Sequence, residues 1–246
     1  MRNFKLTIEY DGSRYQGWQR LASTDRTVQG KLEQALSRLL EEEIEVSGSG
    51  RTDAGVHAKG QVASFHSRTE LECGKLLREL REVLPEDIGI LSLEEVSPRF
   101  HARLHAREKF YRYRVWNSEE PCVFQRKYVY VLPQKLDLDR MRRAAADLTG
   151  SHDFRSFCGK KSDKKSTLRR VDSIEIGRAG EEVHLDFRGE GFLYQMVRIL
   201  TGTLLEVGMG TRDAESMPQL LEARDRAQAG YTVPAKGLCL MEVSYE

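Results

Sequence analysis

The sequence predicts an α+β protein made of two similar halves, and three observations support this prediction. Segments in which apolar and polar residues alternate, typical of half-buried strands, are interspersed with segments of helical spacing. The order strand, helix, strand, strand, helix, strand can be followed in both halves. The 246 residues suffice for one large domain or two of ordinary size. We expect two ferredoxin-like (split βαβ) halves with antiparallel sheets, joined side by side around a central cleft.

The first half, residues 1–104, has the clearer pattern. Alternation, or enrichment in β-branched residues and leucine, predicts strands at residues 4–10, 44–47, 61–66 and 88–96. Apolar stripes predict helices at residues 28–40 and 76–84, and Pro85 ends the second of them. A glycine-rich loop, residues 48–57, is expected between two of the strands.

The second half, residues 105–246, follows the same plan with additions. The expected elements are strands at residues 110–116 and 238–245, a hairpin of residues 169–178 and 182–188, and helices at residues 137–150 and 196–205. Asp137 is the predicted N-cap of the first helix, and Gly150 its C′ residue. Residues 119–135 and a helix around Leu220 are extra. With the helices on one face of each sheet, the other face is open to a ligand.

Composition excludes several classes of protein. A charged fraction of 31% and a hydrophobic fraction of 39% are typical of a globular chain rather than a disordered one. No apolar run approaches the ~20 residues that span a bilayer, and the first residues do not resemble a signal peptide. We therefore expect no membrane contact and a cytoplasmic location. The four cysteines are far apart, so buried free thiols are expected instead of a zinc site or disulfides.

Basic residues cluster in two stretches although the net charge is only +1. Residues 99–114 carry six Arg or Lys against one Glu, and residues 155–170 carry seven against one Asp. Because both stretches also contain aromatic residues, they favour a polyanion partner, with a merely solvated face as the alternative. His101 and His105 could mimic metal ligands on a helix, but Pro98 and the basic neighbours favour an RNA-facing loop.

The loop of residues 48–57 holds a guanidinium, a carboxylate and an imidazole, from Arg51, Asp53 and His57. A surface turn is one interpretation, because Gly, Ser and Asp are common turn residues. A phosphate-binding loop is not supported, because no helix and no Gly-Lys-Ser/Thr follow. Placing Arg51 and Asp53 beside apolar strands is costly unless they are paired or used, which favours a functional loop.

Residues 51–58, Arg-Thr-Asp-Ala-Gly-Val-His-Ala, closely resemble the signature of the TruA family of tRNA pseudouridine synthases. The resemblance extends along nearly the whole chain. Further segments similar to the family's are Tyr10-Asp11-Gly12, Tyr15 with Gly17-Trp18-Gln19, residues 27–30, residues 100–103, residues 111–113, residues 150–154, residues 192–198 and residues 235–238.

This resemblance implies an enzyme that isomerises uridine to pseudouridine in the anticodon stem-loop of tRNA, at positions 38–40, and that acts as a homodimer. The reaction gains and loses no atom, so it needs no cofactor and no metal, only a positioned carboxylate and a pocket that retains the base. The resemblance assigns Asp53 as the catalytic carboxylate. It also makes Tyr111 the flat surface that holds the flipped base, although a tyrosine in an alternating strand is usually a packing residue.

Other site residues are expected from their surroundings. Arg198 lies in an apolar helical stripe, where an unpaired guanidinium would be costly, so it is expected to pair with Asp53 and keep it ionised. Arg51 is expected to position phosphate or the loop, and His57 is not expected to act chemically. The residues expected to contact RNA in the basic stretches are Arg103, Arg107, Lys160 and Lys161.

Three alternatives stay open. A non-catalytic RNA-binding protein could present its sheet to RNA, but the aromatic run of an RRM is missing. A metal-dependent phosphodiesterase needs several convergent carboxylates, and only Asp53 stands out. The same isomerisation at another RNA position is the third alternative.

Overall fold

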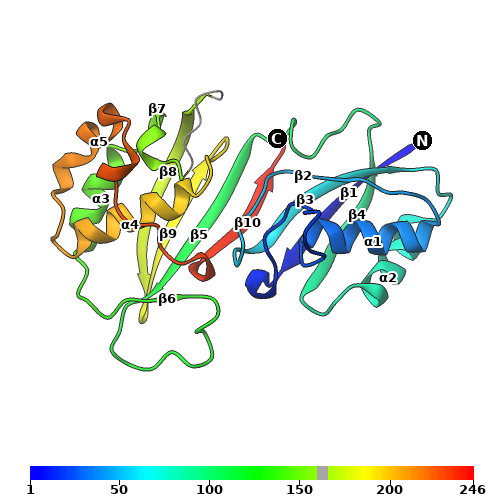
Figure 1. Ribbon diagram of the computed structural model, residues 1–246, viewed down its shortest axis with the longest axis horizontal. Coiled ribbons are helices and arrows are strands. Elements are labelled where there is room, and N and C mark those ends of the chain that lie inside the picture. Colours follow the sequence, from blue (N-terminus) through cyan, green and yellow to red (C-terminus); the bar gives the residue numbers. More distant parts are fainter. Residues whose placement is uncertain (160–165) are drawn as a thin grey trace. The chain divides into compact units, whose positions relative to one another are not determined.

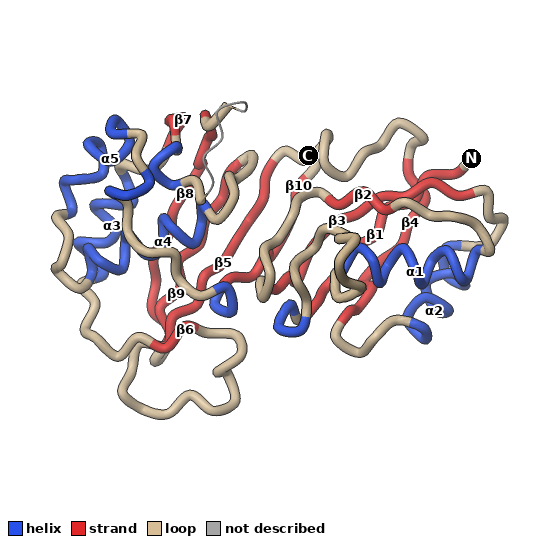
Figure 2. Tube along the Cα trace, viewed as in Figure 1, coloured by secondary structure: helices blue, strands red, loops and turns tan. Residues whose placement is uncertain are grey.

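The computed structural model describes residues 1–159 and 166–246, and it confirms the α+β class (Figure 1). The chain divides into two compact units. Unit 1 comprises residues Met1–Arg107 and Leu240–Glu246, and unit 2 comprises Glu108–Cys239. Each unit contains its own run of antiparallel strands. Each also has its own helices, drawn in blue in Figure 2.

Unit 1 contains the elements predicted for the first half. They are β1 (Arg2–Tyr10), a 3-10 turn η1 (Gly12–Arg14), α1 (Val28–Leu40), β2 (Val46–Gly48), β3 (His57–Ser67), α2 (Cys73–Val83) and β4 (Ile88–Val96). The sheet has the order β4-β1-β3, antiparallel throughout, and β2 pairs with β3. Most of β10 (Leu238–Ser244) belongs to unit 1 and follows β3 in the strand order.

The core of unit 1 follows from the alternation along β1. Phe4, Leu6 and Ile8 are fully buried, and the rings of Phe4 and Phe65 stack with centroids 5.1 Å apart. Both helices contribute buried leucines, among them Leu36 and Leu80. Burial of each such side chain stabilises the fold by roughly 1.5–3 kcal/mol, so this face of the sheet is the main source of stability in unit 1.

Unit 2 contains the elements predicted for the second half except the final strand, together with several short additions. The strands are β5 (Glu108–Trp116), β6 (Tyr130–Val131), β7 (Gly150–Asp153), β8 (Leu168–Ala179) and β9 (Glu182–Gly189). The helices are α3 (Leu138–Ala146), α4 (Met196–Gly208) and α5 (Met217–Ala223), with 3-10 turns η2 (Arg155–Phe157), η3 (Ala214–Ser216), η4 (Arg226–Gln228) and η5 (Ala235–Gly237). The sheet order is β5-β9-β8-β7, and β6 adds to β5 in parallel.

The sheet of unit 2 has one apolar and one polar face. Along β9, Val183, Leu185 and Phe187 are buried, and the residues between them are partly exposed. Nearly all of α4 is buried, and the helices of unit 2 lie together on one side of the sheet (Figures 1 and 2). The prediction that helices cover one face is therefore confirmed for this unit.

The structure corrects two of the expectations. Asp137 is the N-cap of α3, as predicted, and its side chain accepts from the N–H groups of Asp139 and Arg140. The helix ends at Ala146, however, and Gly150 starts β7 with a φ of +96°. Gly150, which suggested a helix end, instead starts a strand with a positive φ, and glycine permits this without strain. The cysteines are free, but only Cys158 is buried.

In the part of the chain that the structure describes, no helix is both long enough and apolar enough to cross a membrane.

Candidate active site

The loop that joins β2 to β3, residues 49–56, carries Asp53, and buried hydrogen bonds fix its start. We call it the carboxylate loop. The backbone N–H of Ser49 donates to the carbonyl of Val62 at 2.7 Å. The Ser49 hydroxyl donates to Gln61 Oε1 at 2.7 Å, and Gln61 Nε2 donates to the carbonyl of Gly50 at 3.1 Å. Because Ser49 and Gln61 are fully buried, breaking these bonds would leave polar atoms without water.

Residues 10–18, which follow β1, hold the middle of the carboxylate loop, and we call them the opening segment. The N–H of Trp18 donates to the carbonyl of Thr52 at 3.1 Å. The hydroxyls of Thr52 and Tyr10 share a buried hydrogen bond of 2.8 Å. Beyond the carboxylate, the N–H of Gly55 donates to the carbonyl of Tyr15 at 3.3 Å. The backbone is therefore tied down on both sides of Asp53.

Two glycines of the opening segment allow this close approach. Gly17 has a φ of +100°, and a Cβ there would lie 2.6 Å from the carbonyl oxygen of Thr52 and 3.2 Å from the nitrogen of Ala54. A Cβ on Gly12 would lie 2.0 Å from the carbonyl oxygen of Val56. Any larger residue would push the opening segment away from the carboxylate loop.

His57 belongs to this clamp. Its Nδ1 accepts the backbone N–H of Gly12 at 3.0 Å, and the side chain is buried. Asp11 Oδ1 also lies 3.2 Å from Nδ1, but that oxygen accepts the N–H of Ser13 at 2.9 Å. Since a backbone N–H can only donate, we assign the ring proton to Nε2 and Nδ1 as the acceptor. His57 thus helps to hold the opening segment against the carboxylate loop.

Arg51 and Asp53 differ in exposure. Arg51 is exposed, and Asp53 is only partly exposed. The carbonyl of Asp53 accepts the N–H of Val56 at 3.1 Å, and Gly55 within this turn has a φ of +79°. The turn therefore fixes the backbone that carries the carboxylate, whereas the side chain of Arg51 is exposed to solvent.

The N-terminal part of the first basic stretch lies in unit 1 as an exposed loop. Arg103 and Arg107 are both exposed. The loop is pinned to the sheet, because Asn3 Nδ2 donates to the carbonyls of Ser97 and Phe100, each at 2.9 Å. This confirms a loop rather than a helix.

The two histidines of this loop contact each other through the backbone. The N–H of His101 donates to His105 Nδ1 at 3.2 Å. No cluster of three or more potential metal ligands exists among the described residues.

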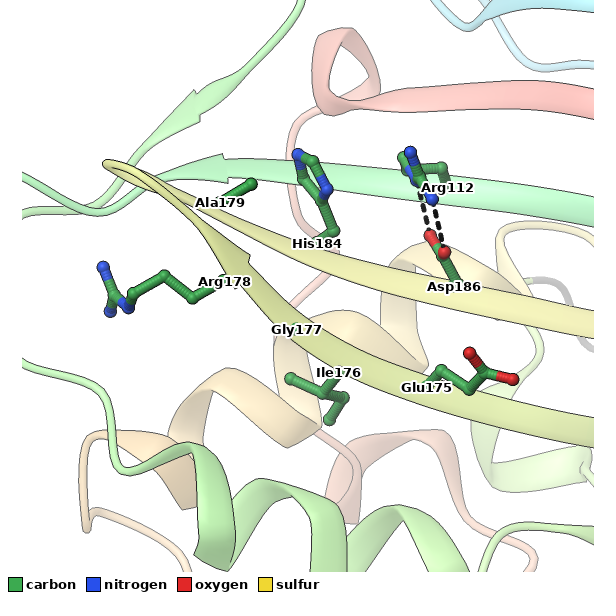
Figure 3. A pocket seen from close by; sticks show the side chains of 8 residues that line it. All are labelled: Arg112, Glu175, Ile176, Gly177, Arg178, Ala179, His184 and Asp186. Atoms are coloured by element: carbon green, nitrogen blue, oxygen red, sulfur yellow. Dashed lines mark hydrogen bonds and ion pairs between the residues drawn. The ribbon is translucent and has the colours of Figure 1, made fainter.

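The C-terminal part of the same stretch is neutralised on the polar face of unit 2. Arg112 forms two hydrogen bonds with Asp186, at 2.6 and 2.7 Å (Figure 3). Arg114 likewise forms two hydrogen bonds with Glu182. The hydrogen bonds that Arg112 donates to Asp186 raise the pKa of Arg112, and those that Arg114 donates to Glu182 lower the pKa of Glu182. A hollow of about 220 Å³ lies beside the first pair. Arg112 and Arg114 are therefore less available to a polyanion than the sequence suggests.

Tyr111 and Arg198 lie in unit 2. Tyr111 is on the apolar face of β5, only 7% exposed, with the ring of Phe192 edge-on at 5.4 Å. Arg198 is on α4 and partly exposed, and its Nε donates to the carbonyl of Val233 at 2.8 Å. Tyr111 is thus packed as a strand residue, and an aromatic neighbour fixes its orientation.

The predicted site residues are therefore distributed over both units. Arg51, Asp53, Arg103 and Arg107 are in unit 1, whereas Tyr111 and Arg198 are in unit 2. Lys160 and Lys161 lie outside the described residues. Pairing of Asp53 with Arg198 stays a prediction.

No role could be assigned to the residues of the opening segment from the sequence alone. Tyr10, Tyr15 and Trp18 contact the carboxylate loop, although they precede it by more than thirty positions. The available signals were the resemblance of these residues to the family's and the density of aromatic residues and glycine from 10 to 18. That composition is also common in ordinary turns, so it did not identify the clamp.

The structure thus shows an α+β protein with a carboxylate on a loop that buried hydrogen bonds hold in place, an arrangement compatible with nucleophilic or acid–base chemistry. Comparison with known proteins identifies the class. The family model described as tRNA pseudouridine synthase matches residues 6–104 and 144–246. These ranges include the carboxylate loop and α4, and omit Tyr111.

Individual relatives are similar over essentially the whole chain. A tRNA pseudouridine synthase A 2 of Bacillus cereus is 47% identical over 245 residues, 100% of both chains. A tRNA pseudouridine synthase A of Moorella thermoacetica is 47% identical over 242 residues, 98% of both. One of Acetivibrio thermocellus is 43% identical over 245 residues, 100% of both. The chain belongs to the tRNA pseudouridine synthase family, and it is an isomerase that acts on uridine in tRNA.

Proposed function

We propose that this enzyme converts uridine to pseudouridine in the anticodon stem-loop of tRNA, at positions 38–40, with Asp53 as the catalytic carboxylate. The observation that carries the proposal is the clamp on the backbone either side of Asp53, formed by Trp18, Tyr10 and Tyr15. A side chain on such a backbone needs little reorganisation when the substrate arrives. Within residues 48–57, Asp53 is the sole carboxylate.

The chemistry requires one carboxylate and a closed pocket. The bond between N1 and C1′ breaks, the uracil turns, and a bond forms between C5 and C1′. C5 loses a hydrogen and N1 gains one, so the overall composition is unchanged. In these steps Asp53 serves as the nucleophile or as the general base, and the pocket retains the detached uracil.

The other site residues have supporting roles in this proposal. The ring of Tyr111 holds the flipped base, Arg198 pairs with Asp53 and keeps it ionised, and Arg51 contacts phosphate or orders the loop. RNA is bound by Arg103, Arg107, Lys160 and Lys161. The exposure of Arg51, Arg103 and Arg107 supports these contacts with a polyanion. As the resemblance implies, the functional form is a homodimer.

The proposal is tested by mapping pseudouridine in unmodified tRNA after incubation with the protein and no additive. New pseudouridine at one or more of positions 38–40 is expected, and none without protein. Pseudouridine only at other positions would contradict the anticodon assignment. Absence of any new pseudouridine, on every tRNA tried, would contradict the proposed activity.

Replacing Tyr111 by Phe and by Ala separates stacking from other roles. Tyr111→Phe is expected to keep most of the tRNA affinity, whereas Tyr111→Ala loses more, because stacking on an aromatic face contributes about 1–3 kcal/mol and needs no hydroxyl. Binding titrations at one salt concentration measure the difference. Melting curves are needed as a control, since Tyr111 packs on Phe192. Equal affinity of the two folded variants would remove Tyr111 from the base pocket.

A further inference from the structure

Phe124 lies in the loop between β5 and β6, residues 117–129, and is 94% exposed. Its neighbour Val123 is 57% exposed. Single exposed apolar residues are normal on protein surfaces, so exposure alone indicates nothing. What distinguishes Phe124 is how the surrounding loop is held and which charges lie beside it. The family model's match omits residues 105–143, which include this loop.

Hydrogen bonds hold the loop on both sides of Phe124. Trp116 Nε1 donates to the carbonyl of Glu120 at 2.9 Å, and Arg114 Nη2 donates to Gln125 Oε1 at 3.0 Å. Arg126 Nη1 donates to the carbonyl of Val123 at 2.6 Å, closing a small ring around Phe124. The backbone on either side of the phenyl ring is therefore restrained, which lowers the conformational entropy lost when a partner binds.

The loop is also joined to the segment that holds Arg198. Lys236 Nζ donates to the carbonyl of Arg126 at 3.0 Å. Lys236 follows Val233 and Pro234 closely in sequence, and the carbonyl of Val233 accepts from Arg198 Nε at 2.8 Å. The carbonyl of Pro234 accepts from the hydroxyl of Tyr113 at 2.7 Å. One short segment thus connects the loop to a proposed site residue within unit 2.

The charges beside Phe124 indicate the chemistry of its partner. Arg126 and Lys127 follow it in sequence, and Lys236 bonds to the same stretch of backbone, whereas the two acidic residues of the loop, Glu119 and Glu120, come before Pro121 at its other end. An aromatic face next to cations is the combination that binds single-stranded nucleic acid, because bases stack on the ring and the cations face phosphates. Lysine is depleted at interfaces between proteins, whereas two of these three cations, Lys127 and Lys236, are lysines.

We propose that residues 117–129 form an RNA-docking loop in which Phe124 stacks on an unpaired base of the bound tRNA, apart from the uridine that reacts. The inference rests on the proposed function for the identity of the RNA. It gives the enzyme a second contact that places the tRNA relative to α4. Phe124 is then a positioning residue.

Three substitutions test the stacking. Phe124→Ala and Phe124→Leu are both expected to weaken tRNA binding about 5- to 150-fold, because neither retains an aromatic face. Phe124→Trp is expected to keep wild-type affinity, and tRNA should quench the emission of the new indole beyond the wild-type background of Trp18 and Trp116. The slope of affinity against salt is expected to stay unchanged in all three, since no phosphate contact is removed. Leu91→Ala on β4, where Leu91 is 45% exposed, is the matched control and should bind normally.

Several outcomes would overturn the inference. Wild-type affinity in Phe124→Ala would show that the ring does not touch RNA, and wild-type affinity in Phe124→Leu would indicate simple apolar docking. A change of oligomeric state in Phe124→Ala, measured by light scattering, would assign the ring to a second copy of the chain. Pseudouridine formation by the wild-type protein is measured in parallel. If the wild type forms pseudouridine normally and the Phe124 variants bind tRNA like the wild type, only the docking loop is rejected. If the wild type converts uridine in no tRNA, the proposed function is rejected.

Discussion

Asp53→Asn is expected to reduce pseudouridine formation to background while leaving tRNA affinity unchanged or slightly higher. The amide keeps the shape of the side chain but can act neither as a nucleophile nor as a base. Removing a negative charge near a polyanion does not oppose binding. The measurement is single-turnover conversion with enzyme in large excess over tRNA, together with dissociation constants at one fixed salt concentration.

Two controls make the Asp53 result interpretable. Melting curves show whether the variant is folded, since loss of the charge could leave Arg198 poorly compensated. Asp25→Asn changes the same functional group on an exposed loop of unit 1, where Asp25 pairs with Lys31 at 2.8 Å, and should convert uridine like the wild type. Near-normal conversion by folded Asp53→Asn would reject Asp53 as the catalytic carboxylate.

Gly17→Ala is expected to lower the single-turnover rate about 100-fold, the loss that a displacement of roughly 1 Å at a reacting group can produce. The added Cβ would sit 2.6 Å from the carbonyl oxygen of Thr52, so the opening segment and the carboxylate loop must separate. Because Gly17 is not proposed to contact the reacting base, the effect reaches the chemistry only through the position of Asp53. Rates and melting curves are measured on the same preparation.

Gly180→Ala is the matched control for this prediction. Gly180 lies between β8 and β9 with a φ of +59°, and a Cβ there meets no atom within 4 Å. Gly180 shares the positive φ of Gly17 but has no such close contact. Gly180→Ala is therefore expected to lose about 1–2 kcal/mol of stability without a comparable loss of single-turnover rate. A wild-type rate in Gly17→Ala, or an equal loss of rate in both variants, would show that the close approach does not position Asp53.

Most elements of the fold could be predicted because their signals are local. The alternation of β1 and of β9 and the capping by Asp137 are all present in the structure. The end of α3 was predicted wrongly, since the glycine that suggested it serves the start of β7. A positive φ is needed in both situations, and the sequence alone does not distinguish them.

The candidate site, like the fold, could be predicted from the sequence only in part. Resemblance pointed to Asp53 through an unbroken run of eight residues, and the basic stretches were visible in the composition. Neither showed that Arg112 and Arg114 are neutralised. Their partners, Asp186 and Glu182, are 74 and 68 positions away in sequence.

Local patterns in the sequence were thus sufficient for the class of fold, the order of the elements and the segment that carries the carboxylate. The clamp around that carboxylate, the neutralisation of two arginines and the return of β10 to unit 1 became visible only in the folded chain. The reason is physical, because periodicity and capping act over a few residues, whereas these contacts form between distant segments. Tyr10 and Thr52, for example, are 42 positions apart, and neither residue type signals the hydrogen bond that joins them.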